Sequence, residues 1–358
     1  MSRFLMVDVG AGTMDVLCYD METDLHYKAV VKSPVQYVAE KASTISGDLL
    51  VTGCEMGGGP ITKVLQDRVK TNEVVISVSA AATLHHNVQK VRSWRICVIE
   101  DDEAEKLRQN KRYSGVTLAD LDPARLKQIV EGFGVPFSFE AVAVCAQDHG
   151  VPPPEVSHLD FRHNIFRARL EEKPFPHALL YRHDEIPEAM NRLASIAQTA
   201  QVLPANEIYV MDSGMAAILG ASMDILAKKK ERIFILDVAT SHTVGAAVIR
   251  DEIAGFFEYH TSDITSARME SLLRALGDGK LEHRQILKEG GHGAFMRKAI
   301  GFGNAEVIIA TGPKRRMLEK SSLPIVFGAP FGDNMMTGTV GLLEAVRRRK
   351  GLKPIVYL

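Results

Sequence analysis

The feature that most constrains this sequence is a unit of strand, acidic residue, turn and strand that occurs twice. The first copy, FLMVDVGAGTMDVLCYD (residues 4–20), places Asp8 at the end of an apolar strand, before a glycine-containing turn. The second copy, FILDVATSHTVGAAVI (residues 234–249), places Asp237 at the equivalent point. Burying a carboxylate is costly unless it has a partner. An acid at the end of each buried strand therefore predicts a bound cation.

The turns of these units carry residues that suit a phosphate site. Gly10 and Gly12 allow backbone N–H groups to approach phosphate oxygens, and the Thr13 hydroxyl adds a further donor. Asp8 and Asp237 are expected to position Mg²⁺, largely through water, because Mg²⁺ retains much of its hydration shell. Two such units that face each other across a cleft can hold one polyphosphate from both sides.

Composition indicates an ordinary globular enzyme. Of the 358 residues, 46% are hydrophobic and 24% are charged, and 43 Lys and Arg residues nearly cancel 44 Asp and Glu residues. This balance gives no overall field that would attract nucleic acid or an acidic membrane, so neither is expected as a partner. No signal peptide or membrane span is predicted, and we expect a cytoplasmic protein.

Cysteine and histidine spacing argues against a metal motif in the sequence. The four cysteines form no CxxC pair, which favours a reducing cytoplasm over a disulfide framework, a zinc ribbon or an iron–sulfur cluster. Four histidines between 158 and 183 match no compact zinc pattern, so scattered surface histidines are the favoured interpretation. These histidines are His158, His163, His177 and His183.

Apolar runs of strand length alternate with helical patterns along the chain, which predicts an α/β fold. The first strands, at 4–9, 16–19 and 26–31, are joined by short turns and predict an antiparallel meander. The second half repeats this order at 233–237, 243–250 and 252–260. Further strands are predicted at 49–52, 74–78, 96–99, 141–146 and 307–310. Helices are predicted at 35–43, 61–70, 81–91, 124–131, 263–276 and 293–299.

Five segments resemble, in order, the motifs of the actin, sugar kinase and Hsp70 superfamily of ATPases. VDVGAGTMD resembles its first phosphate motif, LDVATSHTVGAAV resembles its second, and VIIATGPKRRM stands where its adenosine motif is expected. YVMDSGMAAILGA and FGDNMMTGTVGLLEA resemble its two connecting helices, whose small residues allow the domains to rock. One motif alone would be weak evidence, whereas this ordered set spans nearly the whole chain.

The resemblance implies a two-domain actin-like ATPase (ribonuclease H-like) fold, with duplicated mixed sheets around a cleft that holds Mg²⁺ and ATP. It implies an N-terminal domain with insertions at 1–206, a C-terminal domain at 207–330, and a connecting helix at 331–358 that packs back on the N-terminal domain. Metal binding and catalysis are assigned on this basis to Asp8 and Asp237. The nucleotide is assigned to Gly10, Gly12, Thr13, Asp15, Thr240, Thr243 and Gly312.

Two of these motifs depart from the superfamily pattern. The turn at 239–242 reads ATSH in place of glycines, and Gly312 is followed by Pro313, which has no N–H to offer. Within the superfamily, the chain looks closest to a family sometimes labelled pyruvate formate-lyase activating proteins. That label implies radical chemistry on a CxxxCxxC iron–sulfur motif. The sequence lacks this motif, and we therefore exclude that chemistry.

Two further stretches carry hypotheses about a substrate. VAVCAQDHGVPPP (142–154) is similar to a substrate-adjacent stretch of the superfamily's carbohydrate kinases. Here Asp148 is predicted as a general base or a water-orienting group, with Gln147 and His149 beside the substrate. In VTGCEMGGGPITKVLQ (51–66), Gly58 and Gly59 either border an anion at a helix N-terminus or merely permit a tight turn. This second segment also resembles ATP-dependent activators of acyl-CoA dehydratases.

Three classes of function remain open from the sequence. The chain is either a small-molecule kinase, an ATP-driven activator or chaperone of a client enzyme, or a non-catalytic ligand-binding protein with eroded nucleotide motifs. The expected partners are a nucleotide and either a small-molecule substrate or a client protein. The small-residue helices would also allow a homodimer.

Overall fold

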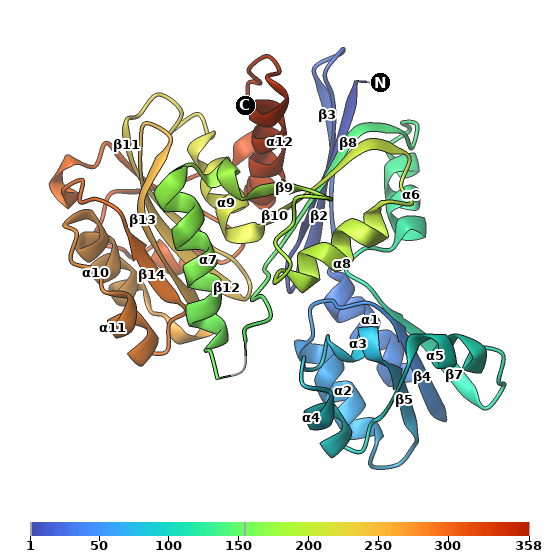
Figure 1. Ribbon diagram of the computed structural model, residues 1–358. Coiled ribbons are helices and arrows are strands. Elements are labelled where there is room, and N and C mark those ends of the chain that lie inside the picture. The colour runs from blue at the N-terminus through green and yellow to red at the C-terminus, as the bar shows by residue number, and fades with distance from the viewer. Residues whose placement is uncertain (1, 154, 358) are drawn as a thin grey trace.

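The computed structural model describes residues 2–153 and 155–357, and its strands form three sheets. Two sheets have six strands each, and the other has four. We call the six-stranded sheets the first and second sheets, in chain order, and the four-stranded one the third sheet. Figure 1 shows the third sheet and its helices as a separate unit beside the first sheet.

The first sheet has the strand order β3-β2-β1-β8-β10-β9. Its first three strands form the predicted antiparallel meander, and β8 and β10 then continue the sheet parallel to β1. β1 and β8 lie at the centre of the sheet and are almost fully buried, which explains why they read as continuous apolar runs. The strands are β1 (Arg3–Val9), β2 (Thr13–Asp20), β3 (Leu25–Lys32), β8 (Phe139–Ala146), β9 (Leu180–Arg182) and β10 (Ala205–Asp212).

The second sheet repeats this arrangement in the order β14-β13-β12-β11-β15-β16. Its strands β11 to β13 form a second antiparallel meander, and β15 and β16 continue the sheet parallel to β11. This duplication of a mixed sheet confirms the predicted fold class. The strands are β11 (Arg232–Val238), β12 (His242–Ile249), β13 (Glu252–His260), β14 (Gly293–Met296), β15 (Val307–Thr311) and β16 (Ile325–Phe327).

The third sheet is parallel throughout, in the order β6-β5-β4-β7, and is inserted between β3 and β8. It has a hydrophobic core of its own, to which α1 and α2 contribute, whereas α6 packs against the first sheet. Its strands are β4 (Asp48–Gly53), β5 (Val74–Ser77), β6 (Cys97–Ile99) and β7 (Tyr113–Leu118). The helices of this region are α1 (Pro34–Thr44), α2 (Gly59–Arg68), α3 (Val78–Ala81), α4 (Val88–Ser93), α5 (Asp101–Leu107) and α6 (Pro123–Gly132).

The remaining helices connect or cover the two large sheets. α7 follows β8 in the chain but lies against the second sheet, beside β14 (Figure 1). α8 packs on the first sheet, and α10 packs against the second. These helices are α7 (His158–Glu172), α8 (Asn191–Ala200), α9 (Ser213–Ser222), α10 (Ser266–Gly277), α11 (His283–Lys288) and α12 (Thr337–Lys350).

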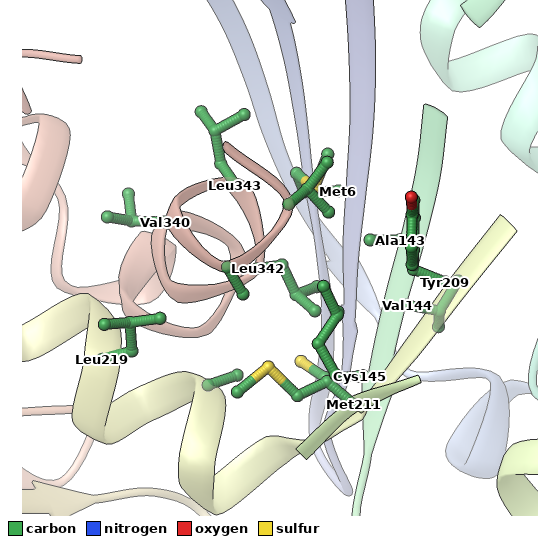
Figure 2. Packing of buried hydrophobic residues seen from close by; sticks show 14 of the residues in the cluster. Met6, Ala143, Val144, Cys145, Tyr209, Met211, Leu219, Val340, Leu342 and Leu343 are labelled. Atoms are coloured by element: carbon green, nitrogen blue, oxygen red, sulfur yellow. The ribbon is translucent and has the colours of Figure 1, made fainter. Parts of the chain in front are cut away.

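Helices α9 and α12 cross each other between the two large sheets. A Cβ atom added at Gly220 would lie 1.8 Å from the carbonyl oxygen of Thr337, so the two backbones are in direct contact. Figure 2 shows Leu342 of α12 among the buried side chains of β1, β8, β10 and α9, which include Met6 and Met211. These are the two small-residue segments that resemble connecting helices. Their side chains are part of the largest hydrophobic core.

The structure corrects three predictions about the fold. The predicted helix at 293–299 begins instead with β14, because four apolar residues pair with the edge of β13. The predicted helix at 81–91 is two short helices, α3 and α4, separated by a loop. The predicted boundary at 206/207 falls inside β10, a strand of the first sheet. Local apolar patterns do not reveal a strand partner that is distant in sequence.

In the part of the chain that the structure describes, every helix falls short of the length and apolar character that crossing a bilayer requires.

Candidate functional site

The two strand–acid–turn units have equivalent turns. In the first, the N–H of Gly10 donates a hydrogen bond to the carbonyl of Thr13 (3.0 Å). In the second, the N–H of Ala239 donates to the carbonyl of His242 (3.1 Å). Each bond joins the second and fifth residues after the strand acid. By this register, His242 occupies the position that Thr13 has in the first unit.

The strands that flank the turns differ in one respect. Asp8 is paired with Asp15 across the first hairpin, whereas Asp237 is paired with Val244 across the second. The first unit therefore presents two carboxylates and the second only one.

The two turns meet between the large sheets. A Cβ atom added at Gly12 would lie 3.1 Å from both Oγ1 and Cγ2 of Thr240. Both turns line one cavity of about 350 Å³, which also reaches the glycine loop before α2. Its wall contains every predicted site residue except Asp148 and Thr243: Asp8, Gly10, Gly12, Thr13, Asp15, Gly58, Gly59, Gln147, His149, Asp237, Thr240 and Gly312.

Ser33 and Gln36 at the start of α1 fix the orientation of the first turn, and the sequence analysis did not identify them. The Ser33 hydroxyl donates to the carbonyl of Gly10 (2.6 Å), and its N–H donates to the carbonyl of Gly12 (3.1 Å). The Gln36 side chain donates to the carbonyl of Ala11 (3.3 Å). These bonds hold the carbonyl groups of the first turn towards α1. The N–H groups of Ala11 and Gly12 in this turn therefore remain available for another partner.

Four backbone N–H groups of the turns have no hydrogen-bond partner within residues 2–153 and 155–357. They belong to Ala11 and Gly12 in the first turn and to Thr240 and Ser241 in the second, and all four residues line the cavity. Unpaired N–H groups on consecutive residues form a concave site that favours an anion. The second turn thus supplies such donors even without glycines.

Three acids converge on the cavity and hold their protons more tightly than usual. Burial raises the pKa of Asp8 to about 7, that of Asp15 to about 8 and that of Asp237 to about 6. For Asp15, the charge of Asp8 adds to the effect of burial. No Lys, Arg or His among the described residues forms an ion pair with any of the three. The Asp15 Oδ1 atom is buried and has no hydrogen-bond partner.

Helix α12 packs its first turn directly against Asp8. A Cβ atom added at Gly338 would lie 2.0 Å from Asp8 Oδ2, so only glycine fits this position. The sequence analysis named this segment as a connecting helix and missed its contact with the acid.

The structure gives Asp148 and Thr243 roles different from those predicted. The buried Asp148 carboxylate accepts hydrogen bonds from the N–H groups of Gly150 (2.8 Å) and Leu193 (2.9 Å), so it joins the loop after β8 to α8. The Thr243 hydroxyl is buried against that of Thr261 (3.0 Å). Neither residue lines the cavity, whereas their neighbours Gln147, His149 and His242 do. Asp148 is thus not placed to act as the predicted base.

A buried arginine from α7 links the two large sheets at one end of the cavity. Arg162 forms ion pairs with Asp212 at the end of β10 (2.8 Å) and with Glu258 of β13. Glu258 lines the cavity and also accepts a hydrogen bond from Gln147. Burial alone would raise the pKa of Glu258, but the nearby positive charges, of which Arg162 is the strongest, together lower it to about 2. Of these three residues, which come from distant segments, only Asp212 lies in a motif that the sequence analysis identified, YVMDSGMAAILGA.

The third sheet approaches the cavity through another ion pair. Arg192 of α8 pairs with the buried Asp120 (2.7 Å) and donates to the carbonyl of Gln147 (2.8 Å). The N–H of Gly57 donates to Asp120 as well (3.3 Å). These contacts hold the glycine loop that contains Gly58 and Gly59 against the end of β8.

The cysteines do not form a cluster site. Cys18 lies in β2, Cys145 in β8 and Cys97 in β6, while Cys54 follows β4. Iron–sulfur clusters require several cysteines that converge on one point. The donor set therefore does not fit such a cluster.

The duplicated mixed sheets and the paired strand–acid–turn units define an actin-like ATPase fold. Residues 56–317, which make up more than half of the chain, match a family model described as "Putative pyruvate format-lyase activating enzyme (DUF1786)". The chain belongs to this family. A search of curated proteins found no significant match.

The chain aligns over most of its length with several solved structures, whose sequences differ widely from its own. A protein from Bacteroides thetaiotaomicron described as having an actin-like ATPase fold is 8% identical, with a TM-score of 0.34, and 91% of this chain and 90% of that chain are covered. The ethanolamine utilization protein EutJ from Carboxydothermus hydrogenoformans is 11% identical, with a TM-score of 0.31 and coverage of 94% and 88%. The ROK hexokinase from Thermus thermophilus is 10% identical, with a TM-score of 0.31 and coverage of 98% and 99%.

Proposed function

We propose that the protein binds Mg²⁺–ATP between its two large sheets and transfers or hydrolyses the terminal phosphoryl group. The observation that carries this proposal is that two acid-ended strands, one from each sheet, bring Asp8 and Asp237 to the wall of a single cavity. A phosphate site built from two duplicated halves needs this convergence.

The acids fit a divalent cation. Asp8, Asp15 and Asp237 are carboxylates without a basic partner in the described part of the chain, and one oxygen of Asp15 has no partner of any kind. Oxygen ligands suit Mg²⁺, which is commonly bound by one or two carboxylates and several waters. Asp8 and Asp237 would hold the ion, with Asp15 beside it. The ion would neutralise charge on the phosphate oxygens during transfer.

The unpaired N–H groups of the two turns fit the phosphate chain. Ala11 and Gly12 would bind phosphate oxygens from one side, and Thr240 and Ser241 from the other. The Thr13 side chain would contribute a hydroxyl at the first turn. Gly312, at φ +85° and packed against the backbone of Val238, borders the cavity where the base would lie.

One part of the cavity wall is suited to bind a phosphoryl acceptor. It is formed by Gln147 and His149 after β8 and by the glycines at 57–59 before α2. A small polar metabolite in this space would lie beside the phosphate chain, which favours a small-molecule kinase. An ATP-driven activator and a non-catalytic binding protein remain the alternatives.

Isothermal titration calorimetry with Mg²⁺ and a non-hydrolysable ATP analogue tests the nucleotide site. The wild-type protein is expected to bind one equivalent. Asp8→Asn is expected to lower the affinity by roughly 100-fold, because a ligand to the cation is lost and even loss of a supporting residue costs 10–100-fold. Asp67→Asn, which changes an exposed acid of α2, is the matched control. Equal affinity of the Asp8→Asn variant and the wild type would refute the proposed site.

A phosphate-release assay then separates the three classes of function. A kinase is expected to release little phosphate alone and to transfer it when its acceptor is added from a metabolite panel. An activator should hydrolyse ATP slowly by itself and faster with its client. Binding without any turnover would identify a non-catalytic protein and overturn the proposed phosphoryl transfer.

A further inference from the structure

Three histidines meet at the edge of the cavity, although they are distant in sequence. His149 follows β8, His242 begins β12, and His292 precedes β14. One ring nitrogen of each lies within 4.8 Å of one in both of the others. His149 and His242 also line the cavity. These residues are separate from the four histidines at 158–183 that the sequence analysis considered and set aside.

The ring nitrogens in this group lack other partners. The Nε2 atom of His242 and the Nδ1 atom of His292 are both buried, and neither has a hydrogen-bond partner among the described residues. His292 is buried as a whole side chain, with 8% of its surface exposed. A buried polar atom without a partner destabilises the folded protein. A cation that accepts a lone pair from each of these two nitrogens would remove this penalty.

An acidic side chain beside the three imidazoles favours a bound cation. Glu258 stands next to the group as an ionised carboxylate, and the N–H of His292 donates to its carbonyl (2.8 Å). Arg162 is balanced by its two acidic partners, Glu258 and Asp212. The local charge is therefore negative without the ion.

We propose that His149, His242 and His292 bind a divalent first-row transition metal ion, with Zn²⁺ as the reference ion. Three neutral imidazoles are a ligand set for such ions and leave at least one position for water or a substrate oxygen. Mg²⁺ is excluded from this site by its preference for oxygen ligands. This ion is thus distinct from the Mg²⁺ assigned to Asp8 and Asp237.

The geometry requires only a small adjustment. Nitrogens bound to a tetrahedral zinc ion at about 2.0–2.1 Å lie about 3.4 Å apart. The three ring nitrogens, at most 4.8 Å apart, would each move by about an ångström or less, which side-chain rotation can provide. Because His149 follows a strand of the first sheet and the other two belong to the second, the ion would also tie the two halves of the cavity together.

The replacement of Thr13 by His242 at the equivalent turn position supports this inference. At this position the second turn has His242 in place of threonine, and a ring nitrogen of His242 lies within 4.8 Å of one in both His149 and His292. A metal ligand at this position accounts for a substitution that a phosphate site alone leaves unexplained.

Metal titration of the tag-free protein tests the proposal. After removal of bound metal by dialysis against a chelator, Zn²⁺ is titrated by calorimetry in the absence of nucleotide, and Co²⁺ is titrated by visible absorption. The expected result is one equivalent of either ion, with the intense visible bands of low-coordinate Co²⁺ and no sulfur-to-metal charge-transfer band. His242→Gln and His292→Gln are each expected to lower the Zn²⁺ affinity by about 100-fold or more, since even loss of a supporting residue costs 10–100-fold.

Two further variants serve as controls for the Zn²⁺ titration. His183→Gln removes an exposed imidazole elsewhere and is expected to retain wild-type Zn²⁺ affinity. Asp8→Asn is expected to retain Zn²⁺ affinity while it loses Mg²⁺–ATP, so a failure of either proposal is recognised separately. The metal site is overturned if the wild type binds no equivalent of Zn²⁺, or if both histidine variants bind it as tightly as the wild type. Circular dichroism confirms that each variant is folded.

Discussion

Gly12 and Thr240 are close neighbours where the two halves of the protein meet, since a Cβ atom at position 12 would lie 3.1 Å from two atoms of the Thr240 side chain. The two turns that would hold a phosphate chain therefore lie close together, and a side chain at position 12 would crowd Thr240.

Gly12→Ala is expected to push the turns apart and to weaken Mg²⁺–nucleotide binding about tenfold, since overpacking of this kind costs about 1–3 kcal/mol. Thr240→Ala removes both atoms that the new methyl group would meet. A double-mutant cycle measured by calorimetry should show a coupling of about 1 kcal/mol, with the double variant binding more tightly than the two single effects predict. Simple additivity of the two changes would show that the contact has no bearing on affinity.

The raised pKa values of the acids predict a specific pH dependence of stability. Asp8 and Asp15, with pKa values of about 7 and 8, bind their protons more tightly in the folded protein than in the unfolded chain. Their contribution to stability is complete below pH 4 and is lost as the pH rises to about 8. The histidines with lowered pKa values have the opposite effect, but only below about pH 6.5.

Between pH 6.5 and 8.5 the metal-free protein should thus become less stable, by up to about 1.4 kcal/mol per pH unit for each proton released. Chemical denaturation at a series of pH values measures this slope. Asp15→Asn should reduce it, because the amide cannot ionise. Addition of Mg²⁺ should also reduce it, because the ion stabilises the charged carboxylates. A slope that is the same in wild type and variant would contradict the assigned pKa of Asp15.

Arg162 is expected to be one of the most important single residues for stability. Arg162→Met would leave the carboxylates of Asp212 and Glu258 buried without a cation, a change that costs about 3–5 kcal/mol. Arg167→Ala on the same helix breaks an exposed pair with Glu171 and should cost about 0.5 kcal/mol or less. Urea denaturation of both variants measures the two losses of unfolding free energy. Similar losses in the two variants would mean that the buried network contributes little to stability.

The crossing of α9 and α12 should tolerate no added side chain. Gly341→Ala would place a methyl carbon 1.8 Å from the carbonyl oxygen of Ala216, so one helix must shift. We expect a loss of about 3 kcal/mol in unfolding free energy, at the upper end of overpacking costs. Gly303→Ala is the control, because a Cβ atom there meets nothing within 4 Å. Thermal unfolding that leaves both variants unchanged would show that the helices separate easily.

Much of the fold could be predicted because the signals are local. The strands at 4–9 and 233–237 are apolar runs that end in an acid, and short turns after them fix an antiparallel meander. The glycines at 10 and 12 mark a turn where the backbone must approach another group closely. The duplication of this pattern predicted the two mixed sheets and the cavity between them.

The predictions were wrong where contacts between residues distant in sequence determine the secondary structure of a segment or the role of a side chain. The segment at 293–296 is a strand only because the edge of β13 is available to pair with it. Asp148 has the same chemistry as Asp8, yet two backbone N–H groups of neighbouring segments occupy its carboxylate. Residue type could not distinguish these acids, since the difference lies in what surrounds them.

The sequence by itself determined the two acid-ended hairpins, their order in the chain and hence the duplicated fold, because each hairpin forms from residues that are adjacent along the chain. Only the tertiary structure brought together His149, His242 and His292, or set Arg162 between acids of two sheets. These groups have no sequence spacing of their own. Their partners are chosen by the packing of α7 and the strands around one cavity, and that packing depends on contacts between distant parts of the chain.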